Sequence, residues 1–195
     1  MFTVENTIEL FRNFAGKVQT DKAWLSDLDT PIGDGDHGTN MARGLTEVEA
    51  KLDAGAFEEP GDVFKAAAMA MIGKTGGASG PLYGTAFMEM SKAVRADPAD
   101  ITGALEAGLA GIQKRGKATT GEKTMVDVWV PVIEAVQTGS LNEAHVDALV
   151  EETKAMKATK GRASYVGERS IGHVDPGSAS SGLFFKALLE GGVLS

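Results

Sequence analysis

Cysteine is absent from this chain of 195 residues. Its absence excludes a disulfide-stapled secreted fold, a zinc–thiolate site and a thiol nucleophile. Long apolar runs are missing too, because Glu5, Glu9, Arg12 and Lys17 interrupt the apolar residues of the first 21 positions. We therefore expect neither a signal peptide nor a membrane-spanning helix, and we expect a cytoplasmic protein.

Positive charge is in the minority, with 19 lysines and arginines against 27 aspartates and glutamates, and the net charge is −8. Nucleic acids and anionic membranes are bound by basic surfaces, so we expect neither as a partner. A phosphate-bearing ligand would also be repelled unless cations lay between it and the acidic side chains.

Strand-like alternation of apolar and polar residues is not sustained anywhere in the sequence. Apolar residues instead recur at spacings of three and four, which is typical of helices with one buried face. We expect a single all-α domain over residues 1–195, a bundle of about eight helices. The expected helices cover residues 4–18, 23–29, 39–52, 63–72, 82–94, 101–112, 126–136, 146–156 and 183–189. Four glycine-rich loops, at 30–38, 73–84, 116–124 and 161–182, should gather at the helix ends, where a ligand could be held.

The first of these loops is acidic. Asp29, Asp34 and Asp36 fall within eight residues, with glycines between them. Two carboxylates about 4 Å apart repel by about 4 kcal/mol at an effective dielectric near 20, so cations should neutralise the group. Magnesium commonly binds through few carboxylates plus substrate phosphates, and three aspartates suit two ions that bridge the phosphates of a nucleotide. The alternative is a solvated loop of Asx turns that binds nothing.

Three familiar motifs fail on this loop and its neighbour. Gly33, Gly35 and Gly38 match GxGxxG, but a helix precedes them where a dinucleotide fingerprint needs a strand. An EF-hand fails because Leu45 stands where a bidentate glutamate is required. A Walker A loop fails because Ala68 occupies the position of its first glycine.

The residues that follow the acidic loop suit phosphate binding. A lone histidine is more often structural, but His37 lies beside the expected metal ligands, so we interpret it as a phosphate contact. Gly38, Thr39 and Asn40 open a helix, expected to be capped by Thr39, whose first amides form a natural anion cradle. Ser79, in the second glycine-rich loop, is either a helix cap or a phosphate ligand.

The third and fourth loops supply the remaining candidates. Met125 either lines an adenine slot with its apolar neighbours or belongs to the core. Arginine suits the charge that develops on a transferred phosphoryl group, which makes Arg162 and Arg169 candidates, although one of them could simply pair with a nearby glutamate. Residues 175–177 predict a turn before a helix that Ser178 caps.

Four segments in this order resemble the nucleotide-binding L subunit of dihydroxyacetone kinase, and the resemblance extends over essentially the whole chain. They are LDTPIGDGDHGTN at 28–40, GGASGPLYG at 76–84, GEKTMVD at 121–127 and GRASY at 161–165. The resemblance implies a barrel-like bundle of eight antiparallel helices with the nucleotide at one end. It implies magnesium ligands at Asp29, Asp34 and Asp36. It implies nucleotide contacts at His37, Gly38, Thr39, Asn40, Ala78, Ser79, Gly116, Met125, Arg162, Asp175, Pro176 and Gly177, with Arg162 and His37 closest to catalysis.

The resemblance also implies partners. A separate K subunit would hold dihydroxyacetone covalently on a histidine, and a phosphohistidine on an M subunit would rephosphorylate bound ADP, which acts as a coenzyme. The length of 195 residues favours this split arrangement, and a homodimer is left open. Two other interpretations stay open: a kinase subunit that exchanges ATP, for dihydroxyacetone or another acceptor, and a non-catalytic module whose nucleotide controls docking on a regulator.

Overall fold

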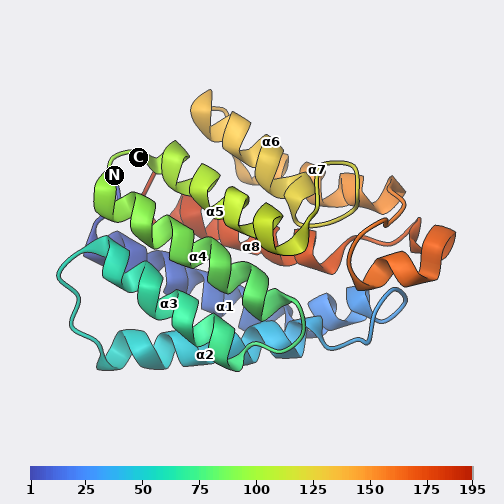
Figure 1. Cartoon of the computed structure of the whole chain (residues 1–195), viewed down its shortest axis with the longest axis horizontal. Helices are drawn as coiled ribbons and strands as arrows, with labels where there is room; N and C mark the ends of the chain where they lie inside the picture. Colours follow the sequence, from blue (N-terminus) through green and yellow to red (C-terminus); the bar gives the residue numbers. More distant parts are fainter. Residues whose placement is uncertain (195) are drawn as a thin grey trace.

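The computed structural model describes residues 1–194, and its regular structure there is entirely helical (Figure 1). This confirms the all-α prediction. The helices, in chain order, are α1 (Val4–Asp29), α2 (His37–Ala54), α3 (Pro60–Lys74), α4 (Ser79–Ala96), α5 (Ile101–Gly116), α6 (Val126–Gln137), α7 (Glu143–Glu152), the short 3-10 helices η1 (Thr153–Ala155) and η2 (Arg162–Ser170), and α8 (Pro176–Glu190).

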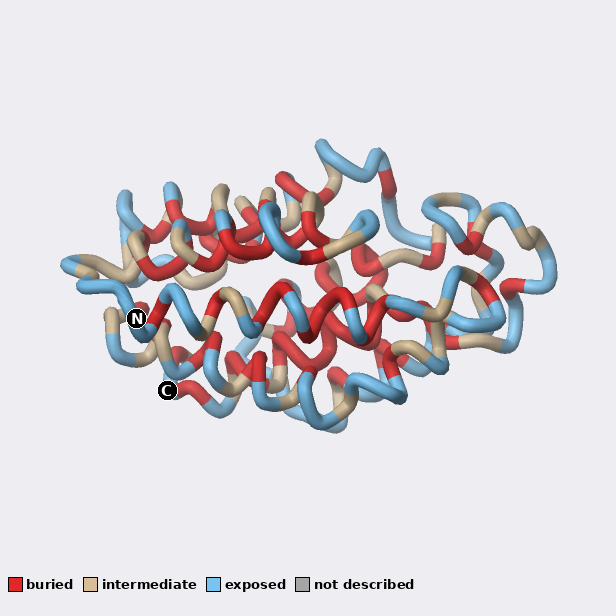
Figure 2. Tube along the Cα trace, turned by 90° about the horizontal axis from the view of Figure 1, so that it is seen from below, coloured by how far each residue is buried: buried red, intermediate tan, exposed pale blue. Residues whose placement is uncertain are grey.

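The helices close into a ring. Each of α1 to α6 packs against the next helix along the chain, α6 and α7 both pack against α8, and α8 returns to pack against α1. The expected barrel-like bundle is therefore confirmed. Buried stretches of the trace face the middle of the bundle, and exposed stretches face outward or lie in the end loops (Figure 2).

Aromatic side chains fill the centre of this ring. Phe11 lies edge-on to Phe64 and Phe87, with ring centroids 5.4 and 5.0 Å apart. Trp129 stacks on Phe184 at 5.7 Å and donates its indole N–H to the Ser181 hydroxyl at 3.0 Å. Aromatic pairs of this kind stabilise a core beyond the area they bury, and the indole, whose polar atom has a partner, is buried without penalty.

Most helix boundaries differ by a few residues from the sequence prediction, and three differences concern the number of helices or the start of a helix at the site. The expected separate helix at 23–29 is wrong: α1 continues without a break, because the polar residues between its two apolar stretches simply face outward and Thr20 bonds back to the Gly16 carbonyl at 2.9 Å. Helix α2 begins at His37, not at Thr39. Helix α8 begins at Pro176 and is capped by Asp175, whose carboxylate accepts the Ser178 amide at 2.7 Å, so Ser178 is not the cap.

The two ends of the bundle differ in character. Both termini lie at the left-hand end in Figure 1, where the Met1 amino group donates to the Val193 carbonyl at 3.1 Å. The acidic loop after α1 and the segment around η2 both lie at the opposite end. Among the described residues, none of the helices is both long enough and apolar enough to cross a membrane. The loop end is thus where four of the predicted site segments can meet.

Candidate functional site

Asp29 fixes the acidic loop through hydrogen bonds to its far end. It ends α1, and its Oδ2 accepts the backbone amides of Asp36 at 3.0 Å and His37 at 3.3 Å, so it takes the place of a side-chain cap on α2. Gly33 allows this approach, because a Cβ at that position would lie 2.0 Å from Asp29 Oδ1. The chain therefore turns back on the Asp29 carboxylate through a residue that cannot be larger.

The three aspartates gather at one point. One carboxylate oxygen from each of Asp29, Asp34 and Asp36 lies within 4.8 Å of the others. Desolvation by partial burial raises the pKa of Asp29, the two backbone amides lower it, and the neighbouring Asp34 and Asp36 charges raise it again. Arg162, from η2, pairs with Asp34 at 2.9 Å and partly offsets this negative charge.

His37 is the first residue of α2 and lies at the inner wall of the site. Its Nε2 is 2.9 Å from the Ser180 hydroxyl, and its Nδ1 is 3.1 Å from the Ser79 hydroxyl. Burial lowers its pKa to about 4, so the ring is neutral near pH 7. The Tyr83 hydroxyl bonds Ser180 at 2.7 Å and Ser181 at 3.0 Å, which extends this polar chain into the core.

Two adjoining cavities occupy this end of the bundle. The first, of about 600 Å³, is lined mainly by residues with polar side chains and by glycines; we call it the polar cavity. The second, of about 350 Å³, is lined largely by apolar side chains from α4, α5 and the start of α6, including Leu82, Ile112 and Met125. Ala78, Lys160 and Gly161 line both cavities, so the two form one continuous depression.

Most of the predicted site residues line these cavities. The polar cavity is lined by Asp29, Asp34, Asp36, His37, Asn40, Ala78, Ser79, Arg162, Asp175, Pro176 and Gly177, and the apolar cavity by Ala78, Gly116 and Met125.

Gly38 and Thr39 are the exceptions, since they line neither cavity in the described structure. A Cβ on Gly38 would lie 1.9 Å from the Lys22 carbonyl oxygen, so this glycine permits the packing of α2 on α1. Gly116 is the last residue of α5, although the sequence placed it in a loop.

Asp175 is a buried carboxylate at the back of the site. Desolvation raises its pKa to about 6, while hydrogen bonds from Ser178 and the charge of Lys123 lower it and Asp127 raises it. Its backbone amide donates to the Thr153 hydroxyl at 3.1 Å. This carboxylate caps α8 and so fixes Pro176 and Gly177 against the cavity.

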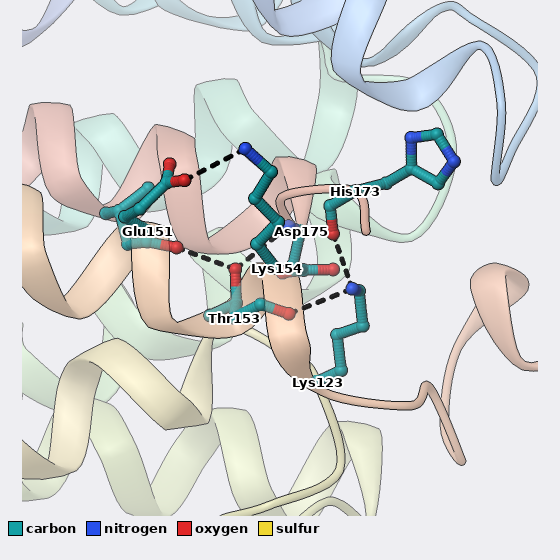
Figure 3. Close-up of polar contacts among 7 residues, drawn as sticks. Lys123, Glu151, Thr153, Lys154, His173 and Asp175 are labelled. Atoms are coloured by element: carbon teal, nitrogen blue, oxygen red, sulfur yellow. Dashed lines mark hydrogen bonds and ion pairs between the residues drawn. The ribbon is translucent and has the colours of Figure 1, made fainter. Parts of the chain in front are cut away.

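Lys123 is a residue of this region for which the sequence suggested no role. Its side chain is buried, and its ammonium group donates to the backbone carbonyls of Thr153 and Ser170 at 2.8 Å each, of Met156 at 3.1 Å, and of His173. Figure 3 shows it between the Thr153 and His173 carbonyls. Only the fold reveals this role, because the acceptors lie 30 to 50 residues further along the chain.

Oxygen ligands gathered beside a large polar cavity suit a hard divalent cation such as magnesium, together with a phosphate-bearing ligand. The paired cavities suit a ligand that has one charged end and one flat apolar end, and their volumes fall in the range of small-molecule sites. The arrangement therefore fits a nucleotide with magnesium better than it fits either alone.

The comparisons with known proteins agree with one another. The profile of the DAK2 domain matches residues 31–190. The chain is 56% identical over 181 residues to PEP-dependent dihydroxyacetone kinase 1, ADP-binding subunit DhaL, of Listeria innocua, covering 91% of each chain. It is 50% identical over 190 residues to the PTS-dependent dihydroxyacetone kinase, ADP-binding subunit DhaL, of Lactococcus lactis, covering 97% of this chain and 98% of the relative.

Among solved structures, the dihydroxyacetone kinase of C. freundii in its native form superposes with a TM-score of 0.75 at 25% identity, covering 96% of this chain and 34% of that one. A second structure of that kinase, in complex with AMP-PNP and Mg2+, superposes with a TM-score of 0.74 at 23% identity, a likeness that shows the fold. This chain thus spans about a third of that longer protein.

Proposed function

Because this chain belongs to the DAK2-domain family, as the DhaL subunits do, we propose that it is the ADP/ATP-binding subunit of a phosphoenolpyruvate-dependent dihydroxyacetone kinase. Residues 1–195 then act as one nucleotide-binding domain, which is supported by a single main hydrophobic core with members from α1 to α8. The site at the loop end of the bundle holds the nucleotide and its magnesium.

The magnesium ligands in this proposal are Asp29, Asp34 and Asp36. Three carboxylates with two oxygens each offer enough ligands for two ions, with the remaining positions left to phosphate oxygens and water. Bound magnesium would offset the charge of the phosphates and of the transferred group. The two backbone amides at the start of α2 fix the Asp29 carboxylate, so this ligand is preorganised for a metal ion.

The nucleotide's two ends match the two cavities. The phosphates lie in the polar cavity, against Asn40, Ala78 and Ser79, where α2 and α4 begin without side-chain caps. Gly38 and Thr39 contribute through the first turn of α2, whose dipole favours an anion. The adenine lies in the apolar cavity beside Gly116 and Met125. The shared residues at 78 and 160–161 then border the ribose.

His37 serves this site as a positioning residue. A neutral ring between two hydroxyls is poorly suited to contact a phosphate as a cation. Because the Ser180 proton goes to the Gly177 carbonyl, the ring donates from Nε2 to Ser180 and accepts the Ser79 proton at Nδ1, which fixes the Ser79 hydroxyl at the edge of the polar cavity. Arg162, whose side chain is largely exposed beside Asp34, would offset charge on the transferred phosphoryl group.

The transfer proceeds in two steps while ADP stays bound. In the first step, the P–N bond of a phosphohistidine on an M subunit breaks and a bond to a β-phosphate oxygen of ADP forms. In the second step, the bond between the γ-phosphorus and the bridging oxygen breaks, and a bond forms to a hydroxyl of dihydroxyacetone on a K subunit. The hydroxyl proton passes to a base outside this chain. This chain supplies alignment and electrostatic stabilisation in both steps.

The observation that carries the proposal is the junction of the acidic group with the paired cavities. A transfer assay with the purified K-type partner tests it, with either a phosphohistidine donor or free ATP supplied. We expect the phosphohistidine donor to sustain turnover, and we expect Asp34→Asn to abolish it. Asp147→Asn is the matched control, because Asp147 is exposed, pairs with Lys186 at 2.6 Å and lines neither of the two cavities in the described structure.

Other outcomes of this assay would point to other functions. Turnover with ATP but not with the phosphohistidine donor would identify an ATP-exchanging kinase. No turnover from either donor, with nucleotide-dependent binding to a regulator retained in Asp34→Asn, would favour a non-catalytic binding module.

A further inference from the structure

Lys123 combines three features that are costly for a lysine. It is 1% exposed, its backbone lies in the left-handed region at φ 60°, and its ammonium group donates to neutral backbone carbonyls, with the charge of Asp175 nearby. Buried ammonium groups and left-handed non-glycine residues persist only where their surroundings over-determine them. We therefore expect Lys123 to have a specific structural or functional role.

The carbonyls that Lys123 binds have a particular placement. Thr153 and Met156 lie just before a segment that we call the covering segment, residues 157–172, and Ser170 and His173 lie at its other end. One ammonium group therefore ties both ends of the covering segment to the loop that precedes α6. In the described structure Lys123 lines neither cavity, so its task is not direct contact with a ligand there.

The middle of the covering segment forms one wall of the site. Residues 159–165 line the polar cavity, among them Arg162, and residues 160 and 161 also line the apolar one. Ala158 and Ala163 pack on Ile32 of the acidic loop in a small apolar cluster that is separate from the main core. The covering segment thus runs from its contacts with Lys123, along the cavity, to the acidic loop that carries the expected metal ligands.

The covering segment has few other attachments at its ends. The Gly172 amide donates to the Lys154 carbonyl at 2.7 Å, the Thr159 amide to the Glu122 carbonyl at 3.2 Å, and the Ala158 amide to the Ser170 hydroxyl at 2.9 Å. Within the described residues, the neighbouring Lys154 side chain pairs with the exposed Glu151 carboxylate alone, at 3.0 Å (Figure 3). Charge-assisted bonds to four carbonyls make Lys123 the strongest of these ties.

We propose that Lys123 is a positioning residue that clamps the covering segment over the nucleotide and thereby sets how slowly the nucleotide leaves. This inference rests on the proposed nucleotide-binding function for its second half. Its first half, that Lys123 holds the segment closed, stands on the contacts alone.

Hydrogen exchange and ligand release test the two halves separately. In Lys123→Met the amides of Thr159 and Gly172 should exchange faster, while amides of α3 and α4, which lie away from the clamp, keep their protection. The dissociation rate of magnesium–ADP should rise by roughly tenfold or more, since several charge-assisted bonds are lost. Lys154→Met is the matched control, and it should change neither readout.

The outcomes separate the inference from the function beneath it. Unchanged exchange and unchanged ADP release in a folded Lys123→Met protein would overturn the inference. If exchange in Lys123→Met is faster only in the covering segment, and wild type binds no magnesium–ADP, the clamp is supported and the proposed function is overturned.

A second variant covers the case in which Lys123→Met does not fold. Lys123→Gln keeps two N–H donors for the carbonyls, but it loses the charge and its side chain is one atom shorter. Faster exchange at Thr159 and Gly172 together with faster ADP release would then support the clamp, and wild-type values for both would overturn it.

Discussion

A single methyl group added at Gly33 should disable the metal-binding loop. The new Cβ would lie 2.0 Å from Asp29 Oδ1 and 2.8 Å from Asp29 Cγ, and the φ angle of Gly33 is not in the left-handed region. An alanine therefore fits the backbone but not the carboxylate. Gly33→Ala must push the Asp29 side chain away, and its effects report on that one contact.

The magnitude follows from the bonds that Asp29 would lose. Its Oδ2 accepts two amides at the start of α2, and hydrogen bonds to a charged group contribute about 1.5–3 kcal/mol each when buried. Asp29 is only partly buried, which reduces this contribution. We expect the free energy of unfolding to fall by about 2 kcal/mol, and magnesium-dependent ADP affinity to fall by about a hundredfold because a ligand has moved.

Chemical denaturation and calorimetric titration of ADP with magnesium measure the two effects. Gly16→Ala is the matched control: Gly16 lies in the middle of α1 with no atom within 4 Å of the added methyl, so this variant should gain about 0.5–1 kcal/mol and bind ADP normally. If Gly33→Ala behaves like Gly16→Ala, Asp29 is not held as described and the reasoning fails.

Three further predictions concern other parts of the site. Asp175, whose pKa burial raises to about 6, binds a proton more tightly in the folded chain than in the unfolded one. As the pH rises from about 4 to about 6, the free energy of unfolding of wild type should therefore fall by roughly 2 kcal/mol relative to that of Asp175→Asn, as measured by urea denaturation across that range. Tyr83→Phe should lower the free energy of unfolding by about 1–3 kcal/mol, because Ser180 and Ser181 each lose a buried partner; a variant as stable as wild type would contradict the network. Arg162→Met should leave the thermal midpoint unchanged, since the Arg162–Asp34 pair is exposed, but should slow phosphoryl transfer by about a hundredfold or more in the coupled assay; equal turnover would exclude Arg162 from catalysis.

The helices and the acidic loop were predictable because their signals are local. The three- and four-residue spacing of apolar side chains predicted six of the α-helices, α2 to α7, to within four residues, and charge repulsion among Asp29, Asp34 and Asp36 pointed to a cation site. The break predicted before Ala23 was wrong because polar residues can mark an exposed helix face as well as a turn, and only packing distinguishes the two.

The rest of the site depends on contacts between distant segments. Gly38 faces the Lys22 carbonyl and not the cavity, which the sequence could not indicate because the crossing of α2 over α1 decides it. The orientation and hydrogen bonding of the His37 ring depend on Ser79 and Ser180, which lie 42 and 143 residues away along the chain. Lys123 lies in the GEKTMVD segment, but nothing in the sequence indicated its role, because its partners are backbone carbonyls, which every residue has.

The central claim is that the loop end of the bundle holds ADP through magnesium on the three aspartates. The most direct measurement is mass spectrometry of the nucleotide released on denaturing protein that was purified gently without added nucleotide, followed by calorimetric titration of emptied protein with ADP, with and without magnesium. We expect released ADP, and rebinding that requires magnesium and is lost in Asp34→Asn. Protein that carries no nucleotide and takes up none with magnesium would contradict it.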